Sequence, residues 1–311
     1  MGKIVLHRLV QAMMVAWSVG TLTFVLLRSL PGDMAYRIAA GRYGYDNVDS
    51  AAADAVRAEL GLERPVLEQY LGWLGDLLQF NLGTTLVSGA PVSQELQHQL
   101  GHSLLLASMA LLLSAFIALP LGILCALKSQ GKLDLASLIA SSLLRAQPVF
   151  VIGLILILAF ALHLGWFPVA GFGTALHLVL PSVALALSLA AVSNRVVRNS
   201  TYEVLHSAYF EFSRIKGLTA RQTFLRHGLR NMAVPVVACM GIQLVGLIEG
   251  IVMIESLFSW PGIGHGLAHA IFSRDVPMIQ GTALTLGLIF VFINTLIDLV
   301  CHWLDPRDNR E

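Results

Sequence analysis

The chain has 311 residues, of which 56% are hydrophobic and only 13% charged, with a formal net charge of +1. Soluble domains carry about 25% charged residues, so this chain cannot cover itself with a solvated surface. The composition excludes an ordinary soluble domain and predicts an integral membrane protein. Cys125, Cys239 and Cys301 all lie in apolar segments, where cysteine packs as a small hydrophobe, so neither a disulfide framework nor a zinc site is expected.

Six apolar runs are long enough to cross a bilayer, which takes roughly 20 helical residues. In chain order they span 9–30, 102–127, 136–163, 176–195, 233–255 and 279–303. Only helices and closed barrels satisfy their backbone in lipid, and runs of this length indicate helices. The predicted fold class is therefore all-α, a polytopic membrane protein with six transmembrane helices.

The connection between the first two runs has structure of its own. Within 31–101, apolar residues recur at helical spacing from Val66 to Leu78, and Asp49 and Ser50 are suited to capping a helix that begins near them. We expect three parts: an N-terminal segment with the first span (1–30), a small folded external subdomain (31–101) and a core domain with five spans (102–311). Lysine and arginine are concentrated in the segments that lie on the same side of the membrane as the N-terminus, which predicts that both termini lie inside.

A basic, amphipathic segment at 195–232 interrupts the core domain on that inner side. Gly217 permits the left-handed backbone that ends a helix, and Thr219 can cap the next one, so we expect two short helices at an angle. With Phe210, Phe212 and other apolar residues on one side, such a pair suits docking into a groove on a partner. A basic segment lying on lipid headgroups is the alternative from composition alone.

This segment resembles the conserved cytosolic loop of the permease subunits of bacterial ATP-binding-cassette importers. The match consists of the triplet Glu211-Phe212-Ser213, Gly217 and Leu229, although Phe212 and Ser213 stand where that loop has alanines and Arg230 where it has proline. "RHGLRN" before a membrane helix is typical of the dipeptide, oligopeptide and nickel permeases. Other stretches resemble the same branch in order along the chain, so the resemblance covers nearly all of it. They are "LGLERPVLEQYLGWL" (60–74), "FNLGTT" (80–85), "LGWFPVAG" (164–171), "IESLFSWPGIG" (254–264), "RDVPMIQG" (274–281) and "LDPR" (304–307).

The resemblance implies a permease of the type I importer fold, whose cytosolic loop enters a cleft on an ATPase subunit. The positions that the resemblance implies for coupling lie within 195–232. Among the basic residues of this segment, Arg214, Lys216 and Arg221 are candidate partners for acidic groups on the ATPase. For each of these basic residues, ordinary positive-inside charge is the simpler interpretation. The coupling positions are Glu211, Ser213, Arg214, Gly217, Leu218, Leu229 and Asn231.

The resemblance also implies the partners: a second, related permease, two cytosolic ATPase subunits and an external solute-binding protein. It places the chain in the inner membrane of a bacterium, with short peptides or nickel and other metal chelates as the solute. The sequence has no G-x-x-x-x-G-K-[ST] motif. We therefore expect ATP and Mg²⁺ to bind to the partner subunits and no cofactor to bind to this chain.

Charged and polar residues inside the spans point to possible solute contacts, because a charge at bilayer depth costs about 2.5–3.5 kcal/mol on insertion scales. Glu249 and Gln243 in the fifth run are candidates for the solute path, and a hydrogen bond that fixes helix packing is the alternative for Glu249. Arg145 in the third run is expected to be structural and to lie near the inner interface, where it can snorkel.

Trp260, Pro261 and Gly262 form a turn on the predicted outer side and are candidate contacts for the binding protein. His265 and His269 follow four residues apart, a spacing that can place two imidazoles on one helix face, but no third metal ligand lies nearby in sequence, so no metal site is predicted. An intramembrane enzyme and a self-contained channel are the rival classes. The enzyme would need an activated nucleophile or a metal, and no H-E-x-x-H or G-x-S-x-G motif occurs.

Overall fold

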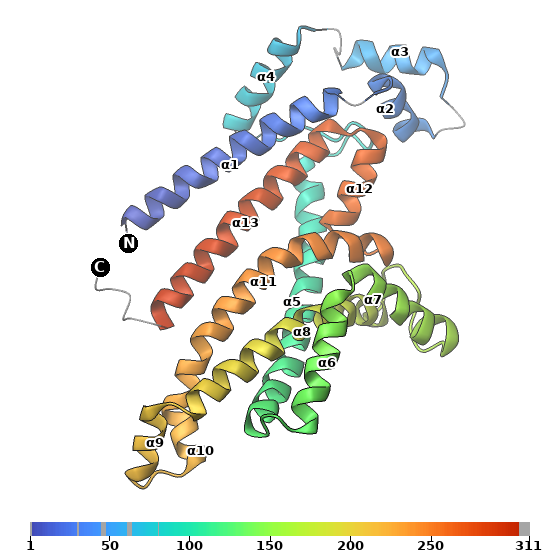
Figure 1. Cartoon of the computed structure of the whole chain (residues 1–311). Helices are drawn as coiled ribbons and strands as arrows, with labels where there is room; N and C mark the ends of the chain where they lie inside the picture. Colours follow the sequence, from blue (N-terminus) through green and yellow to red (C-terminus); the bar gives the residue numbers. More distant parts are fainter. Residues whose placement is uncertain (1, 30, 45–47, 61–63, 80, 305–311) are drawn as a thin grey trace. The chain divides into compact units, whose positions relative to one another are not determined.

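The computed structural model of the chain describes residues 2–29, 31–44, 48–60, 64–79 and 81–304 (Figure 1). Within these ranges the regular structure is helical, apart from one isolated β-bridge between Thr84 and Pro91. The predicted all-α class is confirmed. The helices in chain order are α1 (Gly2–Ser29), α2 (Met34–Tyr43), α3 (Ser50–Glu59), α4 (Val66–Leu78), α5 (Val92–Leu127), α6 (Lys132–Ala146), α7 (Val149–Leu156), the π-helix η2 (Ile157–His163), α8 (Ala175–Leu205), α9 (Ala208–Ile215), α10 (Ala220–Thr223), the π-helix η3 (Phe224–Gly228), α11 (Leu229–Leu257), α12 (Ile263–Ser273) and α13 (Val276–Leu304).

Five helices of the described chain are long and apolar enough to span a membrane, and a sixth span is reached if α6 and α7–η2 count as one bent pair. The expected third span is thus not one straight helix, because the chain bends by 104° between its two halves. Pro148 accounts for the break. It lacks a backbone N–H, and it disfavours the helical conformation at Gln147, whose backbone is extended at φ −97° and ψ 136°.

The chain divides into two compact units, Met1–Ser103 with Pro261–Val291, and Leu104–Trp260 with Phe292–Glu311. The stretch 261–291, which the sequence assigned to the core domain, belongs to the same unit as the N-terminal third of the chain. Helices α5 and α13 each contribute residues to both units.

In the first unit, α2 and α3 pack on each other through a small apolar core. Their starts follow from local chemistry, since Asp33 caps α2 and Asp49 caps α3, each accepting a backbone N–H at 2.8–2.9 Å. The helix predicted to begin near Asp49 and Ser50 is confirmed as α3, and the helical spacing from Val66 to Leu78 is confirmed as α4. Helix α2 was not predicted. The core residues are Ala35, Ile38, Ala39, Ala53 and Val56.

A second core of the first unit joins the start of α5 to α12 and the start of α13. Asp275, in the corner between α12 and α13, connects this core to the 83–89 turn. Its carboxylate accepts the backbone N–H of Leu86 at 3.0 Å and that of Met278 at 3.3 Å. This packing explains why 261–291 belongs with the N-terminal unit.

The second unit is built on α8, which is buried along most of its apolar length by α6, α7 and α11. Glycines allow two close approaches within this unit. A Cβ on Gly122 of α5 would lie 2.7 Å from Val197 Cγ1, and one on Gly241 of α11 would lie 2.6 Å from Ile297 Cγ1 of α13. The main core of the unit lies between α7, α8 and α11 and ends at Trp260.

Candidate functional site

The segment predicted to couple to an ATPase lies in the second unit, at the joined ends of α8 and α11 (Figure 1). Here α8 ends at Leu205 and the short helices α9 and α10 follow, leading through η3 into α11. We call residues 206–228 the α9–α10 segment. The two expected short helices are confirmed, with one continuous membrane helix leading into them and one leading out.

Local interactions explain the break between the two helices. Gly217 has φ +92°, a conformation that L side chains rarely adopt, and it ends α9. Thr219 and Gln222 then form a capping box. The Thr219 hydroxyl accepts the Gln222 N–H at 3.3 Å, and the Gln222 side-chain oxygen accepts the Thr219 N–H at 3.0 Å. The predicted glycine break and threonine cap are both confirmed.

The α9–α10 segment has one anchored side and one exposed side. Phe210 is buried in an apolar cluster with Val204 of α8 and Met232 of α11. Phe210 therefore holds the segment to its own chain, and its assignment to the docking surface was wrong. Phe212 and Ile215, in contrast, are 56% and 78% exposed.

The predicted coupling residues lie mostly on the exposed side. The exposed ones, among the described side chains, are Glu211, Arg214, Gly217, Leu229 and Asn231. Leu218 is half-buried, and the Ser213 hydroxyl donates to the Tyr209 carbonyl at 2.8 Å, which occupies it within α9. The Lys216 ammonium lies 4.5 Å from the centroid of the Phe212 ring. Apolar and basic groups are thus presented together, a combination suited to a groove with acidic edges.

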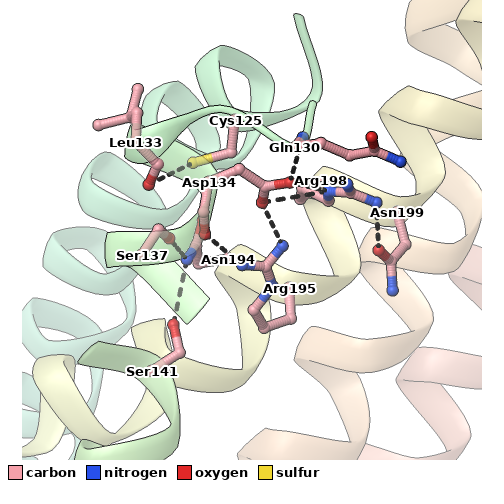
Figure 2. A network of polar contacts seen from close by, with 10 residues as sticks. All are labelled: Cys125, Gln130, Leu133, Asp134, Ser137, Ser141, Asn194, Arg195, Arg198 and Asn199. Carbon is pink, nitrogen blue, oxygen red and sulfur yellow. Dashed lines mark hydrogen bonds and ion pairs between the residues drawn. The ribbon is translucent and has the colours of Figure 1, made fainter. Parts of the chain in front are cut away.

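Sequence reasoning missed a buried ionic cluster where α6 begins beside α8 (Figure 2). Asp134 is only 7% exposed, and its carboxylate accepts hydrogen bonds from two arginines of α8. The Arg195 guanidinium donates at 2.8 Å and that of Arg198 at 2.7 Å. The Gln130 backbone N–H donates to the same carboxylate at 3.2 Å. Charge-assisted bonds of this kind are among the stronger hydrogen bonds of proteins.

Asn194 extends this cluster by one turn of α8. Its side-chain amide donates to Ser137 Oγ at 2.6 Å and to Ser141 Oγ at 3.2 Å. Ser137 and Ser141 are four residues apart and therefore share one face of α6. We call Asp134, Ser137, Ser141, Asn194, Arg195 and Arg198 the Asp134 cluster. It fastens α6 to the part of α8 that leads into the α9–α10 segment.

The surroundings of Gln243 and Glu249 give little support to their predicted role in the solute path. The Gln243 amide is half-buried and donates to Ser193 Oγ of α8 at 2.8 Å, which favours a packing role. Glu249 lies on α11, but its side chain is outside the described residues.

The tryptophan turn is mostly internal. Trp260 is 2% exposed, and its ring centroid lies 5.2 Å from that of Phe172, edge to face. In this conformation the indole has no surface to offer a partner. Pro261 is half-buried and Gly262 is buried, and their contact with a binding protein stays a prediction.

His265 and His269 of α12 point toward each other, with their Nε2 atoms 3.2 Å apart. Burial, and then the neighbouring His269, lower the pKa of His265. No group of three or more His, Cys, Asp and Glu side chains among the described residues could hold a metal ion. Because its pKa is lowered, His265 favours its neutral form in the folded chain.

An all-helical chain with five to six candidate spans and an exposed helical knob between two of them has the architecture of a polytopic membrane transporter subunit. The families that the chain matches are also those of membrane transport proteins. Residues 118–309 match the family described as binding-protein-dependent transport system inner membrane component, and residues 1–91 match its N-terminal companion family. The chain belongs to this family and to its peptide-type branch of ATP-binding-cassette permeases.

Relatives align over almost the entire chain. The probable peptide ABC transporter permease protein y4tP of Sinorhizobium fredii is 37% identical over 99% of both chains. The glutathione transport system permease protein GsiC of Pectobacterium atrosepticum is 36% identical over 92% of both chains. A putative peptide transport system permease protein of Brucella suis is 34% identical over 99% of both. The chain is therefore a transport permease subunit and a multi-pass inner-membrane protein.

Proposed function

We propose that this chain forms the translocation path for short peptides, with its α9–α10 segment held by a separate ATPase subunit. The observation that carries the proposal is the segment itself. Phe210 anchors it to α8 and α11, while Phe212 and Ile215 are exposed beside Arg214 and Lys216. A surface of this kind fits a groove with an apolar floor and acidic edges.

The Asp134 cluster supports a lever mechanism. Because α8 is one continuous helix from Ala175 to Leu205, a displacement of α9 acts on the whole of α8. The ion pairs from Asp134 to Arg195 and Arg198 pass that displacement to α6, and α6 ends at the break before Pro148. Coupling requires an element with two arrangements that both sites can bias. The jointed pair α6 and α7–η2 is our candidate for that element.

The names of the relatives favour peptides as the solute. Those aligned above are described as peptide or glutathione permeases, and glutathione is itself a small peptide. We therefore place short peptides ahead of nickel or other metal chelates. The remaining parts of the proposed machine are a second permease, two ATPase subunits that bind ATP and Mg²⁺, and an external solute-binding protein. Both termini and the α9–α10 segment lie on the cytosolic side.

The test is to purify the tagged permease from its native membrane and to identify what accompanies it. We expect an ATPase subunit and a second permease, and ATP-dependent uptake of tripeptides by vesicles reconstituted with the full complex and its binding protein. Peptide uptake by the permease without any ATPase would contradict the proposal. Labelling of a cysteine introduced at exposed Ile215 from the external side of intact cells would contradict it as well.

A further inference from the structure

Arg145 occupies an unusual place in the fold. It lies in the last turn of α6, two residues before Gln147 and three before Pro148, at the point where the chain turns by 104°. Gln147, two residues further on, is also exposed, and its backbone is extended. A charged side chain thus stands at the break between two helical halves.

The packing around the break places Arg145 level with the middle of α8. Leu144 and Val149, on either side of it, pack into the main core together with Leu185 of α8. Leu185 lies near the middle of the apolar part of α8, which runs from Ala175 to Ser193. The rise of α6 agrees, because Arg145 follows Lys132 by thirteen helical steps, which advance about 20 Å within a hydrocarbon layer of about 30 Å. This rise favours a position inside the layer over the inner interface expected from the sequence.

The rest of the described chain does not neutralise this arginine. Its side chain is exposed, and among the described residues it makes no hydrogen bond or ion pair. Its position in the last turn of α6 gives a weak attraction to the helix carbonyl end, but most of the five guanidinium donors remain available. Charges at this depth face a cavity, a path or a partner rather than lipid.

We infer that Arg145 binds the free carboxylate of a peptide as it passes the break between α6 and α7. This inference rests on the proposed function. Arginine is suited to the task because its planar fork donates two parallel hydrogen bonds to a carboxylate. Broken helices near the membrane midplane are also where transporters place their solute contacts, because the interrupted backbone must line a cavity or be buried in protein.

A carboxylate from the second permease is the competing occupant of this position. The two occupants differ in what they predict for different solutes. If Arg145 binds the peptide carboxylate, its removal lowers the uptake of peptides that carry a free carboxylate and leaves the uptake of other peptides unchanged. If it pairs with a partner subunit, its removal lowers the recovery of the assembled complex and lowers the uptake of all solutes equally.

The experiment compares two equimolar tripeptide libraries, one with free C-terminal carboxylates and one with C-terminal amides, in vesicles that hold the complete transporter and its binding protein. Arg145→Gln removes the charge, Arg145→Lys keeps the charge without the fork, and Ser142→Ala is the control on the exposed part of the same helix. The binding protein can itself prefer one library. This preference cancels when the acid-to-amide uptake ratio of each variant is divided by that of the wild type. Uptake, complex recovery and ATP hydrolysis without solute are measured for each variant.

We expect Arg145→Gln to lower the uptake ratio of free acids to amides at least about tenfold, the range of a lost charge-assisted hydrogen bond. Arg145→Lys should fall between this variant and the wild type, and Ser142→Ala should match the wild type. Equal loss for acids and amides would overturn the inference, and reduced complex recovery would assign Arg145 to the partner permease. Failure of the wild type itself to take up either library would contradict the proposed function instead.

Discussion

Replacing Asp134 with asparagine should destabilise the second unit markedly. The Asp134 side chain is 10% exposed, and those of Arg195 and Arg198 are 21% and 18% exposed. Removing one partner of a fully buried ion pair costs about 3–5 kcal/mol, whereas exposed pairs contribute about 0–1 kcal/mol. Because both arginines retain some water, we expect a loss of about 2–3 kcal/mol for Asp134→Asn, between these limits.

The assay is thermal unfolding of the purified permease in detergent. For a chain of this size, 1 kcal/mol shifts the midpoint by about 2 °C, so Asp134→Asn should lower it by about 4–6 °C. Asp54→Asn is the matched control. Asp54 is also paired with an arginine, Arg57, but its side chain is 69% exposed, and Arg57 keeps its second partner Asp33. The control should shift the midpoint by less than about 2 °C.

A double-mutant cycle separates the ion pair from other effects of the substitution. Arg198→Gln should destabilise the wild type, but it should cost much less in a chain that already carries Asp134→Asn. Strictly additive losses, or an Asp134→Asn shift no larger than that of Asp54→Asn, would refute the view that this carboxylate fastens α6 to α8.

Two further predictions concern packing and pH. Gly122→Ala should lower the unfolding midpoint by about 2–6 °C through overpacking, because its Cβ would meet Val197 at 2.7 Å and the Asn194 carbonyl at 2.9 Å. Gly101→Ala in the same helix meets nothing within 4 Å and should be neutral or stabilising; equal effects of the two would contradict this packing. The lowered pKa of His265 favours its neutral form in the folded state. The unfolded chain therefore gains a proton first as the pH falls through about 6.5, and stability is lost. His265→Gln should flatten that decline between about pH 7 and about pH 5, and an unchanged pH profile would contradict the assignment.

The parts of the structure that the sequence predicted correctly depend on local chemistry. The lengths of the apolar runs located the membrane helices, because only long apolar helices satisfy their backbone in lipid. Gly217 determines where α9 ends, and the capping box at Thr219 determines where α10 begins. Both signals involve only residues within a few positions of one another. The same holds for α3, whose cap Asp49 lies directly before it.

The features that escaped prediction depend on contacts between distant residues. Asp134 and its arginines are more than 60 positions apart, and no spacing rule connects them. Pro148 was visible, but a proline inside a membrane helix can cause a slight kink or a full break. The outcome here depends on how α7 packs against α8 and α11. The inward direction of Phe210 likewise follows from packing against other helices.

Gly217 gives the most direct test of our proposal that an ATPase subunit holds the α9–α10 segment. Gly217 is exposed, has φ +92° and has nothing within 4 Å of an added Cβ, so a new side chain would project outward. Asparagine and aspartate have the same size and tolerate positive φ comparatively well, so they differ here mainly in charge. Co-purified ATPase and ATP-dependent peptide uptake are measured for Gly217→Asp and Gly217→Asn. We expect the aspartate variant to lose ATPase capture or to hydrolyse ATP without uptake, while the asparagine variant stays closer to the wild type. Full uptake with normal ATPase binding in the aspartate variant would contradict the proposal.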